Sequence, residues 1–198
     1  MPQSLSNCLI HAIWSTKDRF PFLTDKAVRD EFHSVIGGIS ARLGCPTLIV
    51  GGVEDHVHIL MQLARTISIA DWVKETKRAS TVWMQERCEK AAKTVHRATT
   101  ANRRLDNPSK MLDQSQVLRA QQAVLRGDQA SQWNYPLLAK FKWQGGYADF
   151  SVSESNVAAV RRYIANQERH HKTMSFQDEY RKFLTSNNME WDERFVWD

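Results

Sequence analysis

Asp55-His56-Val57-His58-Ile59-Leu60-Met61-Gln62-Leu63 is the stretch that decides the fold of this chain. It is short and aliphatic, and it follows the turn-prone pair Gly51-Gly52, so it predicts a β-strand. Side chains on a strand alternate between the two faces of a sheet, so His56 and His58 share one face. Neutral imidazoles bind divalent cations, and strand spacing lets two of them converge on one ion. The stretch predicts half of a metal site, although a His-x-His strand also fits two hydrogen-bonded surface histidines.

Size and composition limit the kind of protein this is. The chain has 198 residues, which fits one domain over residues 1–198. Its net charge of +5 and pI near 9.2 favour an acidic partner, such as nucleic acid, over a neutral metabolite. It has no basic N-terminal segment followed by an apolar one, and no apolar run of membrane-spanning length. We therefore expect a soluble, cytoplasmic protein with no membrane partner.

Three further segments have strand composition. Residues 8–15 are apolar on both faces, as in a central strand, and residues 46–50 precede the His-x-His strand as its hairpin neighbour. Residues 141–152 return to strand composition around Gly145-Gly146, which suggests a bulge or a close backbone approach.

Apolar residues spaced three and four apart predict four helices. Their expected caps or first residues are Thr24 or Asp25, Ile67 or Ser68, Ser153 or Ser155, and Ser175. Gly44 occupies the position of a C-terminal glycine after the first helix. The third helix carries Tyr163 and Gln167 four residues apart, so they lie on one face, one turn from each other.

Basic residues near the predicted sheet and helices are candidate phosphate contacts. They are Lys17, Arg19, Lys74, Lys77, Arg78, Arg161, Arg162 and Arg169. A solvated charged face is the other interpretation of the helical ones. Residues 88–134 hold eight basic and four acidic residues with a weak core pattern, so we expect a basic insertion, helical in part over Gln114 to Arg126. Residues 174–198 are expected to form a C-terminal helical extension with an aromatic tail.

The third helix can complete the metal site of the two histidines if it lies across their face of the sheet. The Gln167 carbonyl would then be the third ligand of the ion, with the Tyr163 phenol about one helical turn away. A phenol beside a divalent ion suits covalent cleavage of a phosphodiester, because the ion stabilises charge on the departing oxygen. Spacing alone also allows a half-buried Tyr163 and a surface amide at Gln167.

These residues also carry a family resemblance. His56-Val57-His58 preceded by Gly52-Val53-Glu54-Asp55, with Tyr163-Ile164-Ala165-Asn166-Gln167 downstream, resembles the single-tyrosine HUH transposases. That family comprises the transposases of small insertion sequences that move as single-stranded DNA, and domesticated relatives associated with repetitive extragenic palindromes. The resemblance covers residues 8–86 and 141–171.

The resemblance implies an α/β (α+β) fold, a ferredoxin-like sandwich whose antiparallel sheet of four to five strands carries packed helices. It implies that His56, His58 and Gln167 bind Mg²⁺ or Mn²⁺ and that Tyr163 forms a 5′-phosphotyrosine bond. The implied activity is that of a single-strand DNA endonuclease and strand transferase, a transposase that nicks and rejoins single-stranded DNA at hairpin-flanked sites. A homodimer is possible, since some insertion-sequence members supply the tyrosine helix to the partner's site, whereas the palindrome-associated relatives are more often monomers.

Three alternatives stay open. One is a domesticated repeat-associated nickase, and another is a replication-type or conjugative HUH endonuclease, although such proteins usually have a three-histidine cluster and further domains. The third, from another class, is a non-catalytic protein that binds nucleic-acid hairpins. The insertion at 88–134 and the tail after residue 174 depart from the family pattern, so the DNA sequence and the oligomeric state are not predicted.

Overall fold

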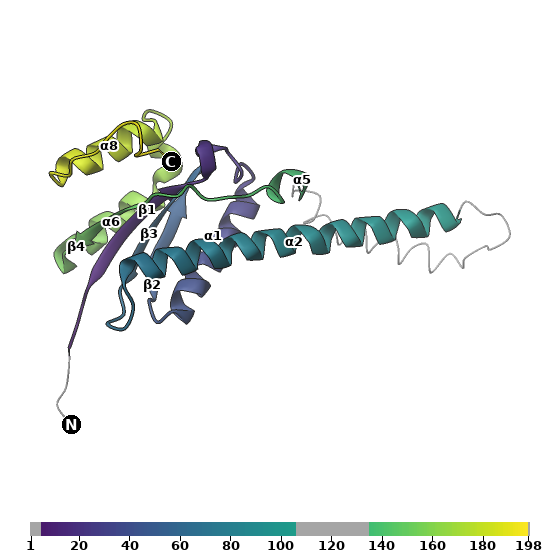
Figure 1. The fold of residues 1–198 in the computed structure, drawn as a ribbon, viewed down its shortest axis with the longest axis horizontal. Coiled ribbons are helices and arrows are strands. Elements are labelled where there is room, and N and C mark those ends of the chain that lie inside the picture. Colours follow the sequence, from purple (N-terminus) through teal and green to yellow (C-terminus); the bar gives the residue numbers. More distant parts are fainter. Residues whose placement is uncertain (1–4, 106–134, 198) are drawn as a thin grey trace, which may run out of the picture. The chain divides into compact units, whose positions relative to one another are not determined.

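A four-stranded antiparallel sheet forms the centre of the fold (Figure 1). The computed structural model describes residues 5–105 and 135–197. The strands are β1 (Leu9–Ser15), β2 (Thr47–Gly52), β3 (His56–Gln62) and β4 (Ala148–Val152), in the order β2-β3-β1-β4. With one helix after β1 and another after β3, the chain follows the β-α-β-β-α-β path of a ferredoxin-like sandwich. The predicted fold class is confirmed.

The helices are α1 (Lys26–Arg42), α2 (Ile69–Leu105), α5 (Tyr135–Leu138), α6 (Val157–Ala165), α7 (Gln167–His170) and α8 (Phe176–Ser186). Two short 3₁₀ turns, η1 (Lys17–Arg19) and η2 (Glu154–Asn156), complete the elements described. None of the helices that the structure describes is long and apolar enough to cross a membrane. The expected helix at the C-terminal extension is present as α8.

The chain divides into two compact units. One comprises residues 1–81 and 141–198 and holds the sheet, α1 and α6 to α8. The other comprises residues 82–140 and holds the C-terminal part of α2 together with α5. Most of the predicted basic insertion, including the helix expected over Gln114 to Arg126, lies outside the described residues.

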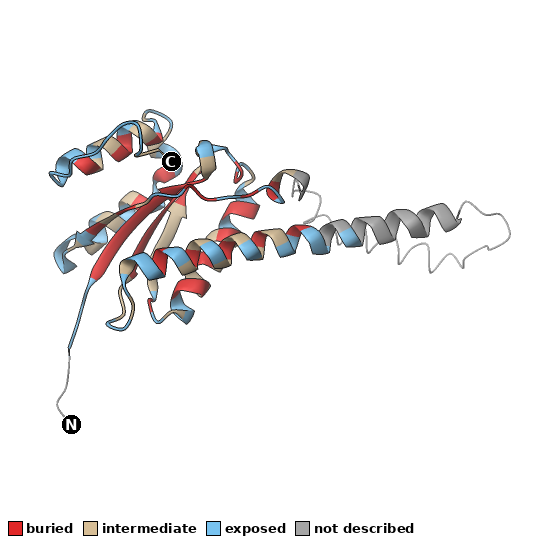
Figure 2. Cartoon of the chain, in the orientation of Figure 1, coloured by how far each residue is buried: buried red, intermediate tan, exposed pale blue. Residues whose placement is uncertain are grey.

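The two faces of the sheet are both covered, which is why β1 is buried along its whole length (Figure 2). On one face Trp14 packs edge-on against Trp72 of α2, with ring centroids 5.8 Å apart. On the opposite face Ile13 of β1 packs with Phe176 and Leu184 of α8. Ile13 is paired with His58 of β3, so the two side chains lie on the same face of the sheet. The face that carries the histidines is therefore covered by the C-terminal helices.

Several local predictions are confirmed by the caps. The Asp25 side chain accepts a hydrogen bond from the Val28 N–H at the start of α1, and Gly44 ends that helix with a φ of 76°. The Ser175 hydroxyl accepts the Asp178 N–H at 3.2 Å at the start of α8. These signals depend only on neighbouring residues, so the sequence displays them fully.

The expected serine cap of α6 is wrong. The 3₁₀ turn η2 comes first and separates Ser153 from the first residue of α6, Val157. The hydroxyls of Ser153 and Ser155 contact each other at 3.0 Å, and Asn156, which precedes α6, makes no side-chain cap.

The strand expected over residues 141–152 is also shorter than predicted. Regular pairing is confined to β4, and Trp143 makes an isolated bridge to Thr16. The backbone between them is held in a turn, because the Lys77 ammonium donates to the carbonyls of residues 144, 145 and 146 at 3.1, 3.2 and 2.6 Å. Those carbonyls therefore have a side chain as partner and take no part in a strand ladder.

Candidate active site

The first two residues of the site are His56 and His58 at the start of β3. Both side chains are fully buried on the face that α6 and α8 cover. The His56 Nδ1 lies 2.7 Å from the Asp55 carboxylate, and the His58 Nδ1 lies 3.0 Å from the His11 Nε2. Partners of this kind fix the orientation and the tautomer of a metal-binding histidine. In each ring the Nδ1 is thus occupied and the Nε2 is directed into the site.

Helix α6 reaches this face because Gly51 of β2 has no side chain. A Cβ there would lie 2.7 Å from Ile164 Cγ2, so glycine permits the close approach of helix and sheet. The ring centroids of Tyr163 and His58 lie 5.9 Å apart, and the Gln167 Oε1 lies 3.5 Å from the His56 Nε2. The structure therefore brings the four residues His56, His58, Tyr163 and Gln167 together within one chain.

The prediction that Tyr163 and Gln167 share one continuous helix is wrong. The helix breaks at Asn166, whose φ of −102° and ψ of 15° separate α6 from α7. The two side chains nevertheless converge on the same atom, because the Tyr163 hydroxyl and the Gln167 Nε2 both donate to Glu179 Oε1.

Glu179 of α8 is the unexpected member of the site. Only 2% of it is exposed, and its Oε2 lies 3.0 Å from His171 Nε2, 3.5 Å from His58 Nε2 and 3.7 Å from His56 Nε2. The ligand atoms of these four residues all lie within 4.8 Å of one another, which is close enough for one metal ion.

The protonation states of His58 and His171 suit a cation. Burial and the neighbouring His56 hold the pKa of His58 well below its usual range, and the same two causes lower the pKa of His171 to about 4. Burial raises the pKa of Glu179 to about 7. The imidazoles of His58 and His171 are therefore neutral at pH 7, which is the form that binds metals.

Unpartnered polar atoms gather at the same point. His58 Nε2, His171 Nε2 and Glu179 Oε2 are buried and have no hydrogen-bond partner, and the same holds for His170 Nε2 beside them. Buried polar atoms are normally satisfied, and leaving one unsatisfied costs about 1–3 kcal/mol. A divalent cation would satisfy the imidazole nitrogens and the carboxylate oxygen together, so the residues present fit a metal.

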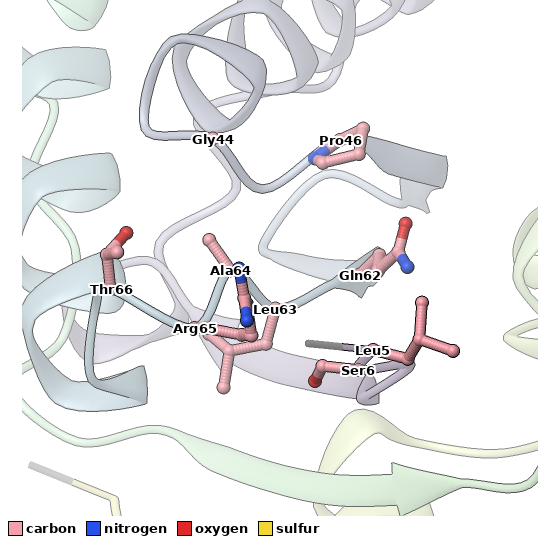
Figure 3. Close-up of a pocket in the computed structure, with 9 residues that line it drawn as sticks. All are labelled: Leu5, Ser6, Gly44, Pro46, Gln62, Leu63, Ala64, Arg65 and Thr66. Carbon is pink, nitrogen blue, oxygen red and sulfur yellow. The ribbon is translucent and has the colours of Figure 1, made fainter. Parts of the chain in front are cut away.

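Access to Tyr163 is through a pocket of about 630 Å³ that opens beside α6 and α7. Its lining comprises Ala159, Arg162, Tyr163, Asn166, Arg169, His170 and Thr173. Two of the predicted phosphate contacts, Arg162 and Arg169, therefore line the same pocket as Tyr163. A second hollow of about 430 Å³ lies at the other end of β3, around Gly44 and Gln62, and contains none of the predicted site residues (Figure 3).

The other predicted phosphate contacts are scattered. Lys17 and Arg19 lie in η1, next to the start of β3 because the Thr16 N–H donates to the Asp55 carbonyl. Arg161 is exposed on α6, and so are Lys74 and Arg78 on α2, where Arg78 pairs with Glu75 at 2.7 Å.

Lys77 has a different task from the one predicted. Its ammonium donates to three carbonyls of the 144–146 turn, and it lies 5.5 Å from the centre of the Trp14 ring. Burial lowers the pKa of this lysine to about 8. An ammonium has three N–H donors, and all three are engaged, so Lys77 has none left for a phosphate.

Three residues of the site were not predicted from the sequence: Glu179, His171 and His11. A signal for Glu179 existed, because it lies on the apolar stripe formed by Phe176, Tyr180 and Phe183, and a charged residue on a buried stripe is rarely there without a partner. His171 follows Gln167 by four residues but lies beyond α7, so helical spacing alone did not place it.

The comparison with protein families identifies the family of this chain. The family model described as "Transposase IS200 like" matches residues 4–102, half of the chain. The chain belongs to the IS200-like transposase family. This membership confirms the resemblance and makes the chain a DNA-processing protein of the transposase type, with DNA as its partner.

Among solved structures, this IS200-like transposase is similar to a protein of low sequence identity. A crystal structure of a candidate transposase from Deinococcus radiodurans R1 is 23% identical, with a TM-score of 0.44. The match covers 84% of this chain and 95% of that one. No curated protein matches the chain.

Proposed function

We propose that this chain is a metal-dependent transposase that nicks and rejoins single-stranded DNA through a 5′-phosphotyrosine intermediate. Tyr163 is the proposed nucleophile, and His56, His58 and Gln167 are the proposed ligands of a divalent cation such as Mg²⁺ or Mn²⁺. The single observation that carries the proposal is the meeting of Tyr163 with the buried histidine pair of the same chain.

In the proposed reaction the Tyr163 oxygen attacks the phosphorus of a DNA phosphodiester. A bond forms between that oxygen and phosphorus, the bond from phosphorus to the 3′ oxygen breaks, and the 3′ oxygen takes a proton from water. The phenolic proton passes to an acceptor, for which Glu179 Oε1 is in place because it already accepts the phenol's hydrogen bond. The energy of the broken bond is kept in the phosphotyrosine, so rejoining to another end needs no nucleotide cofactor.

A bound cation would polarise the phosphate and stabilise charge on the departing oxygen. A phenol has a pKa near 10 and is a weak nucleophile when protonated, so this assistance is needed at neutral pH. Arg162 and Arg169 at the mouth of the Tyr163 pocket are the proposed contacts to flanking phosphates, with Arg161 beside them on α6.

Hairpins that flank the cleavage site are the proposed DNA targets, and one chain is the proposed catalytic unit. The second proposal rests on the distances above, since Tyr163 lies in the site formed by the histidines of its own chain. A homodimer in which the tyrosine helix is exchanged needs a different path for α6.

The test mixes the full chain with a labelled hairpin oligonucleotide and Mn²⁺ or Mg²⁺. A protein–DNA adduct that resists denaturant is expected with the unaltered chain and absent in Tyr163→Phe. Tyr147→Phe is the matched control and should form the adduct as the unaltered chain does. An adduct that survives in Tyr163→Phe contradicts the assignment of the nucleophile, and hairpin binding without any adduct favours the non-catalytic alternative.

A further inference from the structure

The segment of residues 171–179, between α7 and the first turn of α8, places two metal-binding groups against the histidine pair. His171 and Glu179 are held there by their own neighbours. The His171 Nδ1–H donates to the Met174 carbonyl at 2.9 Å, and Glu179 follows a helix start fixed by the Ser175 cap. Neither group depends on a metal for its position.

The three imidazoles share one arrangement. His56, His58 and His171 each use Nδ1 for a partner within the protein, which leaves the Nε2 atom of each for the site. With the proton on Nδ1, each Nε2 carries a free lone pair, which is the tautomer that a metal requires. The Asp55 carboxylate and the Met174 carbonyl can only accept, so they place the proton on Nδ1 of His56 and of His171, and His58 has the same form when His11 Nε2 is the acceptor.

The Glu179 carboxylate divides its two oxygens between two tasks. Oε1 accepts from the Tyr163 hydroxyl and from the Gln167 amide, whereas Oε2 is buried without a hydrogen-bond partner. Oε2 is also the oxygen that faces the imidazole nitrogens. A buried carboxylate oxygen that faces only neutral acceptors is unfavourable unless a proton or a cation lies between them.

The spacing of these atoms matches a coordination shell. Ligand atoms about 2.1 Å from an ion lie about 3.4 Å from one another in a tetrahedron and about 3.0 Å at adjacent corners of an octahedron, in which five protein ligands leave one position for a phosphate oxygen. The distances from Glu179 Oε2 to the three Nε2 atoms are 3.0, 3.5 and 3.7 Å. These three distances cover the ligand-to-ligand distances that a coordination shell requires.

We propose that residues 171–179 supply two further ligands of the active-site ion, His171 Nε2 and Glu179 Oε2. This inference rests on the proposed metal site and extends it from two imidazoles to three, with a carboxylate added. A set of three imidazoles, one carboxylate and the Gln167 amide favours a first-row transition-metal dication, such as Mn²⁺ or Zn²⁺, over Mg²⁺, which prefers oxygen ligands and keeps its waters. Because Glu179 Oε1 also holds the phenol, one carboxylate ties the nucleophile to the ion.

The test titrates the full chain with Mn²⁺ in a calorimeter, without DNA. Glu179→Gln and His171→Gln should each weaken Mn²⁺ binding at least about 10-fold. Even a substitution of a residue that only hydrogen-bonds to a metal ligand typically lowers metal affinity about 10- to 100-fold. Glu190→Gln, at an exposed glutamate of the same extension, is the matched control and should bind as the unaltered chain does. Mg²⁺ should bind at least about 10-fold more weakly than Mn²⁺.

A second measurement does not depend on the folding of variants. The X-ray absorption spectrum of the Zn²⁺-loaded chain should fit three imidazoles per ion, and a fit to two overturns the proposal. Unchanged Mn²⁺ affinity in both variants, with binding lost in His58→Gln, also overturns it and leaves the proposed function in place. If three imidazoles bind the ion but no DNA adduct forms, the proposed ligand set is supported and the proposed function is contradicted.

Discussion

Replacing Gly51 with alanine tests whether the close contact of α6 with the sheet positions the nucleophile. The added Cβ would lie 2.7 Å from Ile164 Cγ2 and 2.8 Å from the Ile164 carbonyl oxygen, whereas ordinary contacts begin at 3.4 Å. The helix must therefore move outward by about 0.6–0.7 Å, because a backbone atom cannot rotate away. Overpacking of this kind costs about 1–3 kcal/mol of folding free energy.

The displacement also reaches the chemistry, because Ile164 directly follows Tyr163. A misplacement of about 1 Å in an active site can lower a rate about 100-fold, so we expect covalent attachment to hairpin DNA to slow about 10- to 100-fold in Gly51→Ala. Stability is measured by urea unfolding, and the rate by adduct formation over time.

Gly38→Ala is the matched control for this substitution. The nearest atom to its added Cβ is Arg42 Nη1 at 3.8 Å, which is an ordinary van der Waals contact, and Gly38 lies inside α1. Alanine there should stabilise the fold by about 0.5–1 kcal/mol and leave the rate unchanged. If Gly51→Ala keeps both the stability and the attachment rate of the unaltered chain, the reasoning about the α6 contact is refuted.

Three other substitutions test the account of stability. Burial, with a smaller contribution from Arg29, lowers the pKa of His33 to about 4 in the folded chain, against 6.5 for a free histidine. As the pH falls, His33 is therefore protonated in the unfolded chain before it is protonated in the folded one, and the free energy of unfolding falls between about pH 6.5 and pH 4. His33→Gln should remove up to about 3 kcal/mol of that fall, and an unchanged slope in urea titrations between pH 7 and pH 4 would contradict this. Ser175→Ala should cost about 1 kcal/mol by loss of the α8 cap, whereas Ser155→Ala should cost less than about 0.5 kcal/mol; equal costs would show that the cap is unimportant. Lys77→Met should cost about 1.5–3 kcal/mol through the lost bonds to the 144–146 turn, and an unaltered melting temperature would argue against them.

The sequence was sufficient for those features that depend on local pattern. The alternation in β3 put His56 and His58 on one face, and the Asp25 and Ser175 caps marked where two helices begin. The spacing of Tyr163 and Gln167 predicted that they would act together, and they do meet although the helix breaks between them.

The rest depended on how distant segments pack. No local pattern shows that α8 lies against the histidine face, so Glu179 could not be assigned to a metal site beforehand. Lys77 lies off the apolar stripe of α2, as solvated lysines do, and only the position of the 144–146 turn makes it a half-buried donor. Spacing along a helix cannot distinguish those two situations.

The most direct test of the central claim locates the DNA on the protein after the reaction with hairpin DNA. The chain has four tyrosines, at positions 135, 147, 163 and 180. Nuclease treatment followed by trypsin and mass spectrometry should find the remaining nucleotide on the peptide Tyr163–Arg169 and on none of the others. A nucleotide on Tyr135, Tyr147 or Tyr180, or on a residue other than tyrosine, would contradict the account.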